Sequence, residues 1–195
     1  MRTRVVLCLA PLALAIALAA LSSGGSASVC PAEQGDKAVH QYVGVDKCKL
    51  CHMKKTTGEA YVVWKKQKHA KAFETLATPQ AKEIAKKQGI EDAQKSDKCL
   101  RCHVTGAGAK PEEIASTLKP TEGVGCEVCH GPGGDYYKEE VHAKSRDAGL
   151  KAGMVIPDEK LCVKCHNKDS PSYKEFDYAK FSKEIAHPNP EKQKK

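Results

Sequence analysis

The sequence contains little of the material from which an ordinary hydrophobic core is built. Aromatic side chains make up 5% of its 195 residues, with three Phe and one Trp, whereas charged residues make up 29%. No stretch alternates apolar and polar residues in the way a half-buried strand does, and no repeat of fixed length is present, which excludes a solenoid. These absences disfavour a typical α/β enzyme, and they imply that something other than apolar side chains fills the interior.

The N-terminal apolar run is too short for a membrane anchor. Residues 5–21 form 17 uncharged positions, fewer than the roughly 20 that a membrane-spanning helix needs. Arg2 and Arg4 precede the run and Ser26-Ala27-Ser28 follows it, a pattern typical of a secretory signal peptide and its cleavage site. We therefore expect residues 1–28 to be a signal peptide, the mature chain to be exported to the periplasm, and no transmembrane segment to remain after cleavage. An extracellular location is the alternative.

Ten cysteines and eight histidines stand out against this background. Cys8 falls in the expected signal peptide, and Cys30, beside the cleavage site, is left without an assigned role. The other eight cysteines form four C-x-x-C pairs, each followed directly by histidine: Cys48-Lys-Leu-Cys51-His52, Cys99-Leu-Arg-Cys102-His103, Cys126-Glu-Val-Cys129-His130 and Cys162-Val-Lys-Cys165-His166. In an oxidising compartment, eight such thiols must be in disulfides, in metal sites or in another covalent bond.

Each of the four motifs matches the one that attaches c-type haem. Two thiols on one helical turn can bond the two vinyl groups of a haem, and the histidine that follows supplies the proximal iron ligand. Zinc needs four ligands in total and gains nothing from a histidine in the same place four times. Thioredoxin-like pairs occur on a βαβ pattern that is absent here, and four short-loop disulfides would be unusual. The motifs therefore predict four covalently bound c-type haems, with His52, His103, His130 and His166 as proximal iron ligands.

Four haems would also supply the missing core, because the macrocycles themselves are large apolar surfaces. We expect a mainly α fold with extensive coil, formed by one domain over residues 29–187 and followed by a disordered Pro- and Lys-rich tail at 188–195. The sequence predicts a helix at 58–77 and a second helix from Pro79, capped by Thr78, to Gly89. Weaker helical patterns cover 112–118 and 173–185, and residues 105–110 and 131–134 read as loops.

The mature chain has four further histidines, which are candidates for the distal iron ligands: His40, His69, His142 and His187. Four spare histidines for four irons favour bis-histidine ligation, which gives lower haem potentials than methionine ligation. Met53 adjoins His52 and cannot easily reach the opposite haem face, and Met154 is better explained as a gap filler.

Three runs of sequence resemble the tetrahaem cytochrome c-554 family of exported electron carriers, and the resemblance extends over residues 45–166. The runs are H-A-K-A-F-E-T-L at 69–76, C-L-R-C-H-V-T-G at 99–106 and, most distinctively, G-V-G-C-E-V-C-H-G-P-G at 123–133. The resemblance implies that His69 shares an iron with His130, His142 with His52 and His187 with His166, and that the haem of His103 is five-coordinate. The chain departs from the family in its short C-terminal region and in His40, which precedes the first motif.

The leading hypothesis is an electron carrier, not an enzyme, that works between redox protein donors and acceptors. Lys65, Lys66, Lys68 and Lys71 could steer an acidic partner, although the same pattern describes an ordinary solvated helix face. The haem propionates would offset much of the net charge of +8, so this charge does not indicate nucleic-acid binding.

Two other functions are consistent with the sequence. The first is self-association into an extracellular filament, in which His40 ligates a haem of the neighbouring subunit. The second is a haem enzyme that acts on a nitrogen oxide at an open iron above His103. No residue is assigned a catalytic role, because no acid or base constellation accompanies the motifs.

Overall fold

The computed structural model describes residues 39–142 and 145–190, and of His142 the backbone alone. The expected signal peptide, Cys8, Cys30 and most of the expected tail lie outside these residues. The described part belongs to one compact unit, Lys37–Lys195, and consists of short helices joined by coil. Within it, the β-structure is limited to a parallel bridge between Tyr42 and Ile114. The prediction of a mainly α fold with extensive coil is confirmed.

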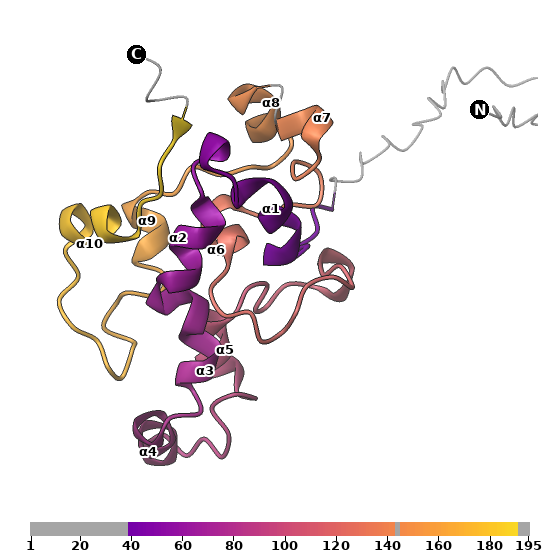
Figure 1. The fold of residues 1–195 in the computed structure, drawn as a ribbon. Helices are drawn as coiled ribbons and strands as arrows, with labels where there is room; N and C mark the ends of the chain where they lie inside the picture. The colour runs from indigo at the N-terminus through magenta and orange to yellow at the C-terminus, as the bar shows by residue number, and fades with distance from the viewer. Residues whose placement is uncertain (1–38, 143–144, 191–195) are drawn as a thin grey trace, which may run out of the picture. The chain divides into compact units, whose positions relative to one another are not determined.

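The helices follow one another along the chain as shown in Figure 1. They are α1 (Val45–His52), η1 (Lys55–Thr57), α2 (Ala60–Lys66), η2 (Lys68–Lys71), α3 (Ala72–Thr75), α4 (Pro79–Lys87), α5 (Asp97–His103), η3 (Pro111–Glu113), α6 (Cys126–His130), α7 (Glu139–His142), α8 (Arg146–Lys151), α9 (Glu159–Cys162) and α10 (Tyr178–Ile185). Among the helices that the structure describes, none combines the length and the apolar character of a membrane span.

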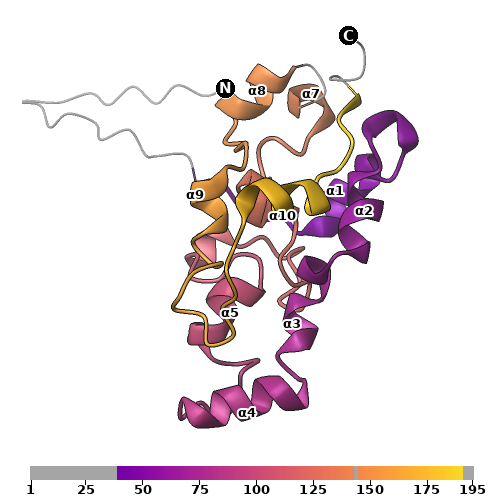
Figure 2. The same cartoon turned by 90° about the vertical axis from the view of Figure 1, so that its left-hand side faces the viewer.

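The apolar core formed by protein side chains is small. Leu76, Ala85 and Ala93 form a buried cluster, against which Cys99 and Leu100 pack. This cluster joins α3, α4 and α5, which lie together at one end of the unit in both Figure 1 and Figure 2. The small number of buried apolar side chains agrees with the composition, which implied that another apolar group fills the interior.

The predicted helix at 58–77 is interrupted at Gln67. This residue has an extended backbone, with ψ of 158°, and separates α2 from η2. Its side-chain Nε2 donates to the Glu184 carbonyl at 3.2 Å, and the following turn presents the His69 carbonyl to the Val124 N–H at 3.0 Å. The tertiary contacts of the turn therefore override the continuous helical pattern.

The predicted start and end of the next helix are confirmed. Thr78 accepts a hydrogen bond on Oγ1 from the Ala81 N–H at 3.2 Å, and Pro79 occupies the first helical position. Gly89 follows the helix with a φ of 66°, in the left-handed region that glycine tolerates at helix ends.

Two weaker helix predictions are corrected. The pattern at 112–118 gives only the short turn η3, because Tyr42 pairs with this segment through its N–H to the Glu113 carbonyl at 2.7 Å and through its carbonyl to the Ala115 N–H at 3.0 Å. The pattern at 173–185 becomes helical only from Tyr178, where Asp177 Oδ1 caps α10 by accepting from the Lys180 N–H at 3.0 Å. Residues 105–110 and 131–134 are turns and coil, as predicted.

Candidate cofactor-binding site

Each C-x-x-C-H motif lies on a helical turn. The first three motifs are carried by α1, α5 and α6. The fourth begins at the last residue of α9, and the turn continues because the N–H groups of Cys165 and His166 donate to the Cys162 carbonyl at 3.2 and 3.0 Å. The two thiols of each pair are therefore separated by about one turn, as attachment to the two vinyl groups of one haem requires.

The thiols of the four motifs differ in their surroundings. All eight are free, and Cys51 is the exposed one. Burial raises the pKa of Cys129 to about 11 and that of Cys165 to about 12, whereas hydrogen bonding to Cys48 lowers the pKa of Cys126. Among the described residues, no group of three or more Cys, His, Asp or Glu could hold a metal ion by itself. Two thiols on one helical turn are the groups that add across the two vinyl double bonds of a haem to form thioethers.

The fold brings the four motifs together in pairs that are far apart in sequence. Cys48 of the first motif hydrogen-bonds to Cys126 of the third, an interaction that, together with burial, raises the pKa of the Cys48 thiol. Cys165 of the fourth motif lies against Cys102 of the second. Cys129 also interacts electrostatically with Cys162. The first motif thus faces the third, the second faces the fourth, and the third lies near the fourth.

Backbone carbonyls orient the imidazoles of two motifs. Nδ1 of His103 lies 2.7 Å from the Ala72 carbonyl, and Nδ1 of His130 lies 3.1 Å from the Val155 carbonyl. Such a bond fixes the ring and leaves Nε2 for iron, as is usual for metal-ligating histidine. The ring of His166 instead stacks on Phe176, with centroids 4.6 Å apart.

Two of the candidate distal histidines lie next to proximal ones. The ring centroids of His69 and His166 are 5.9 Å apart, and those of His187 and His130 are 6.0 Å apart. Imidazole nitrogens bind metal ions at about 2 Å, so two rings on opposite sides of one ion have centroids about 6 Å apart. The structure therefore brings together different pairs from those that the family resemblance implied, in which His69 belonged with His130 and His187 with His166.

The surroundings of His69 suit a metal ligand. Burial, and to a smaller extent the neighbouring His166, lower the pKa of His69. A lowered pKa keeps the imidazole neutral, which is the form that binds iron.

The remaining candidates lie elsewhere. Nδ1 of His40 lies 2.6 Å from Asp135 Oδ2, and its ring lies against Gly153, where an added Cβ would be 3.3 Å from three ring atoms. His142 is the last residue of α7, and its side chain lies outside what the structure describes.

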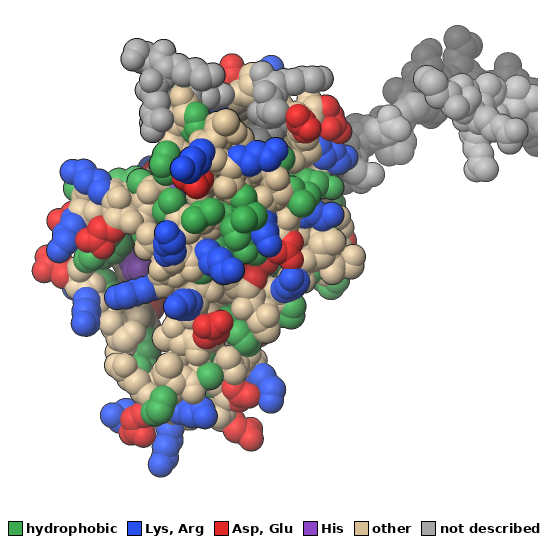
Figure 3. Space-filling model, in the orientation of Figure 1, with side chains coloured by type: hydrophobic (Ala, Val, Ile, Leu, Met, Phe, Trp, Pro, Cys, Tyr) green, Lys and Arg blue, Asp and Glu red, His purple; other side chains and the backbone are tan. Residues whose placement is uncertain are grey.

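Met53 is 46% exposed and lines a shallow hollow with Leu50, Lys49, Lys54 and Asp46. On the face of the molecule drawn in Figure 3, apolar side chains are interspersed with Lys and Arg.

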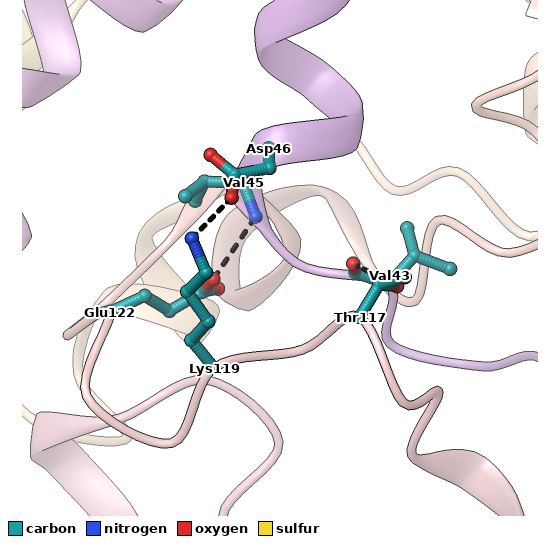
Figure 4. A network of polar contacts seen from close by, with 6 residues as sticks. All are labelled: Val43, Val45, Asp46, Thr117, Lys119 and Glu122. Atoms are coloured by element: carbon teal, nitrogen blue, oxygen red, sulfur yellow. Dashed lines mark hydrogen bonds and ion pairs between the residues drawn. The ribbon is translucent and has the colours of Figure 1, made fainter.

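Sequence reasoning missed two carboxylates, one just before the third motif and one inside it. Glu122 Oε2 accepts from the Val45 N–H at 3.1 Å in the polar network of Figure 4. Glu127, with 1% of its surface exposed, accepts backbone hydrogen bonds from residues that flank two motifs. The available signal was the run at 123–133, which the resemblance singled out as distinctive without explaining why glutamate follows Cys126.

The chain is similar to known cytochromes. A family model described as cytochrome c554 and c-prime matches residues 47–131. Cytochrome c-554 from Nitrosomonas europaea is 35% identical over 154 residues, which cover 77% of this chain and 59% of the length of that relative. A solved structure of the reduced state of cytochrome c554 from Nitrosomonas europaea is 32% identical in sequence, with coverage of 75% of this chain and 79% of that chain and a TM-score of 0.49. The fourth motif lies outside the region that the family model matches.

Proposed function

Because the chain is 35% identical to a cytochrome c-554 over 154 residues, we propose that it belongs to the cytochrome c554 family and is an exported electron carrier that holds four c-type haems. Haem iron supplies one-electron chemistry when it is bound. The observation that carries the proposal is the pairing of motifs in space, with Cys48 against Cys126 and Cys102 against Cys165. Motifs in contact give a connected route for electrons across the unit, and the small number of buried apolar side chains is what we expect where macrocycles form the core.

The cysteines of the four motifs would hold the haems through eight thioether bonds. His52, His103, His130 and His166 would be the proximal ligands. The ring distances support His69 as the distal ligand on the iron of His166, and His187 on the iron of His130. His142 remains the candidate for the iron of His52, as the resemblance implied, and His103 is left without an assigned distal ligand.

The haem count tests this proposal directly. The protein, produced in a host with a c-type haem attachment system, should contain four covalent haems per chain by haemochrome assay and by mass. The variant Cys162→Ser/Cys165→Ser should contain three. A wild-type chain that carries no covalent haem would contradict the proposed function.

The ligand pairs can be tested by double substitution. His69→Gly and His166→Gly should each convert one low-spin iron to high spin in the electron paramagnetic resonance (EPR) spectrum. If the two histidines share an iron, the double variant should also contain one additional high-spin iron, whereas ligands of different irons would give two. The same logic applies to His130 and His187.

An acidic redox protein is the partner that the surface over α1 favours. Leu50 and Met53 are exposed on the first motif and beside it, and Lys49 and Lys54 line the same hollow. Apolar side chains with two lysines beside them suit a transient complex that is steered electrostatically, although Asp46 also lines the hollow. Lys49→Glu/Lys54→Glu should slow electron transfer from an acidic flavoprotein by roughly tenfold at low salt. Lys82→Glu/Lys86→Glu on α4 is the matched control, and an equal loss there would contradict this assignment.

No observation on the described residues favours the filament or the enzyme. His40 is hydrogen-bonded to Asp135 of its own chain, which supports an intrachain role for this residue. The proposal therefore places a non-enzymatic carrier in the periplasm, with redox proteins as its partners.

A further inference from the structure

The carboxylate of Glu127 joins the segments around the first and third motifs. Its Oε1 accepts from the Val43 N–H at 2.8 Å and from the Gly133 N–H at 2.6 Å, and its Oε2 accepts from the Gly44 N–H at 2.7 Å. Glu127 itself lies in α6, between the two cysteines of the third motif. One buried side chain therefore holds both the backbone segment that precedes α1 and the loop that follows α6.

The segment that enters α1 is fixed at successive residues. Gly44 is the N-cap of α1 and provides no side chain to cap the helix, so the donors at this end need partners from elsewhere in the fold. Glu127 serves Val43 and Gly44, and Glu122 serves Val45. Thr117 Oγ1 also donates to the Val43 carbonyl at 2.7 Å, as Figure 4 shows. The start of α1 is thus fixed mainly by two glutamates, one just before the third motif and one inside it.

The surroundings of Glu127 leave little freedom for another arrangement. A Cβ added at Gly133 would lie 2.9 Å from Glu127 Oε1, so glycine is what permits the backbone to approach the carboxylate. Three backbone N–H groups donate to this carboxylate. Its two oxygens only accept hydrogen bonds, so each of the three donors has an acceptor. The amide of glutamine would place its NH₂ group against at least one N–H donor.

We propose that Glu127 is a positioning residue, which sets the spacing between the first and third motifs and hence the coupling of the two haems that they hold. This inference rests on the proposed electron-carrier function. Cys48 and Cys126, the first thiols of the two motifs, are already in contact, so a small displacement of α1 against α6 changes the separation of the haem pair. Electron transfer and magnetic coupling between two irons both fall steeply with distance.

The test compares Glu127→Gln with Glu74→Gln. Both variants remove one negative charge, but Glu74 is exposed on α3. The fully ferric protein is examined by EPR, in which closely spaced irons broaden each other's signals, and the haem content is counted in the same samples. We expect Glu127→Gln to retain four haems and to lose the coupled signal of one haem pair, while Glu74→Gln keeps the wild-type spectrum. Four haems with an unchanged spectrum in Glu127→Gln would overturn the inference.

A second variant covers the case in which Glu127→Gln does not accumulate. Thr117→Val loosens the same segment at Val43 without altering α6, and should weaken the same coupled signal. An unchanged spectrum in Thr117→Val would then overturn the inference. A wild-type chain without covalent haem is a different result, because it contradicts the proposed function rather than the role of Glu127.

Discussion

At the scale of single residues, the three sequence runs that resemble the cytochrome c-554 family meet around Thr105. Its Oγ1 donates to the Gly123 carbonyl at 3.0 Å and accepts from the Gly125 N–H at 2.9 Å. The His69 carbonyl accepts from the Val124 N–H between those two glycines. The three runs are therefore joined to one another by hydrogen bonds that haem attachment alone does not require.

Replacing Thr105 tests this junction. Thr105→Val keeps the shape but leaves the Gly125 N–H without its acceptor, so we expect the free energy of unfolding to fall by about 1–3 kcal/mol. Denaturant unfolding of the haem-loaded protein measures the change. Thr75→Val removes a comparable bond, to the Lys71 carbonyl, on an exposed turn, and should cost less. Equal losses in the two variants would argue against a special role for Thr105.

Glu122 makes stability depend on pH. Burial raises the pKa of this carboxyl above its ordinary value of 4.5, although the hydrogen bond from the Val45 N–H acts in the opposite direction. A raised pKa means that the folded state binds more protons than the unfolded state, so the free energy of unfolding should decrease as pH rises from 4.5 through the raised pKa. Glu122→Gln should flatten this dependence in unfolding curves recorded at several pH values. An unchanged slope would contradict the burial of an ionisable Glu122.

At the scale of elements, local signals decided some boundaries and tertiary contacts decided others. Thr78 and Pro79 start α4 as predicted, because the cap is formed within four consecutive residues. The break at Gln67 was not predictable, since its reason is the bond that the His69 carbonyl accepts from Val124, far along the chain. The short η3 likewise reflects the pairing of Tyr42 with Glu113 and Ala115.

The contact between η2 and the third motif can be tested at Gly123. A Cβ there would lie 2.8 Å from the His69 carbonyl oxygen and 2.9 Å from that of Ala70, and the residue has a φ of 75°. Gly108 has a similar φ of 78° with no atom within 4 Å. Gly108→Ala should therefore cost about 1 kcal/mol from backbone strain alone.

Gly123→Ala should cost at least twice as much, because η2 must also move away from the new methyl group. Thermal unfolding of both variants measures the difference. Equal destabilisation would show that the close approach of η2 does not contribute.

At the scale of the whole molecule, the sequence contains the four motifs and predicts a fold with few buried apolar side chains. Motif chemistry is local, so Cys48 to His52 can be recognised without any knowledge of the fold. The spatial pairing of motifs is not local, and neither is the choice of distal ligand. His69 lies beside His166 and His187 beside His130, an arrangement that depends on where η2 and the segment after α10 pack. Glu127 was overlooked for the same reason. The three N–H groups that donate to it belong to residues just before the first motif and just after the third.

A redox titration with electron counting tests the central claim most directly. The oxidised protein, titrated with a one-electron reductant and followed by its visible absorption, should take up four electrons per chain and return them reversibly on oxidation. Failure to take up any electron, or uptake of a smaller number with all motifs intact, would contradict a carrier built on four haems.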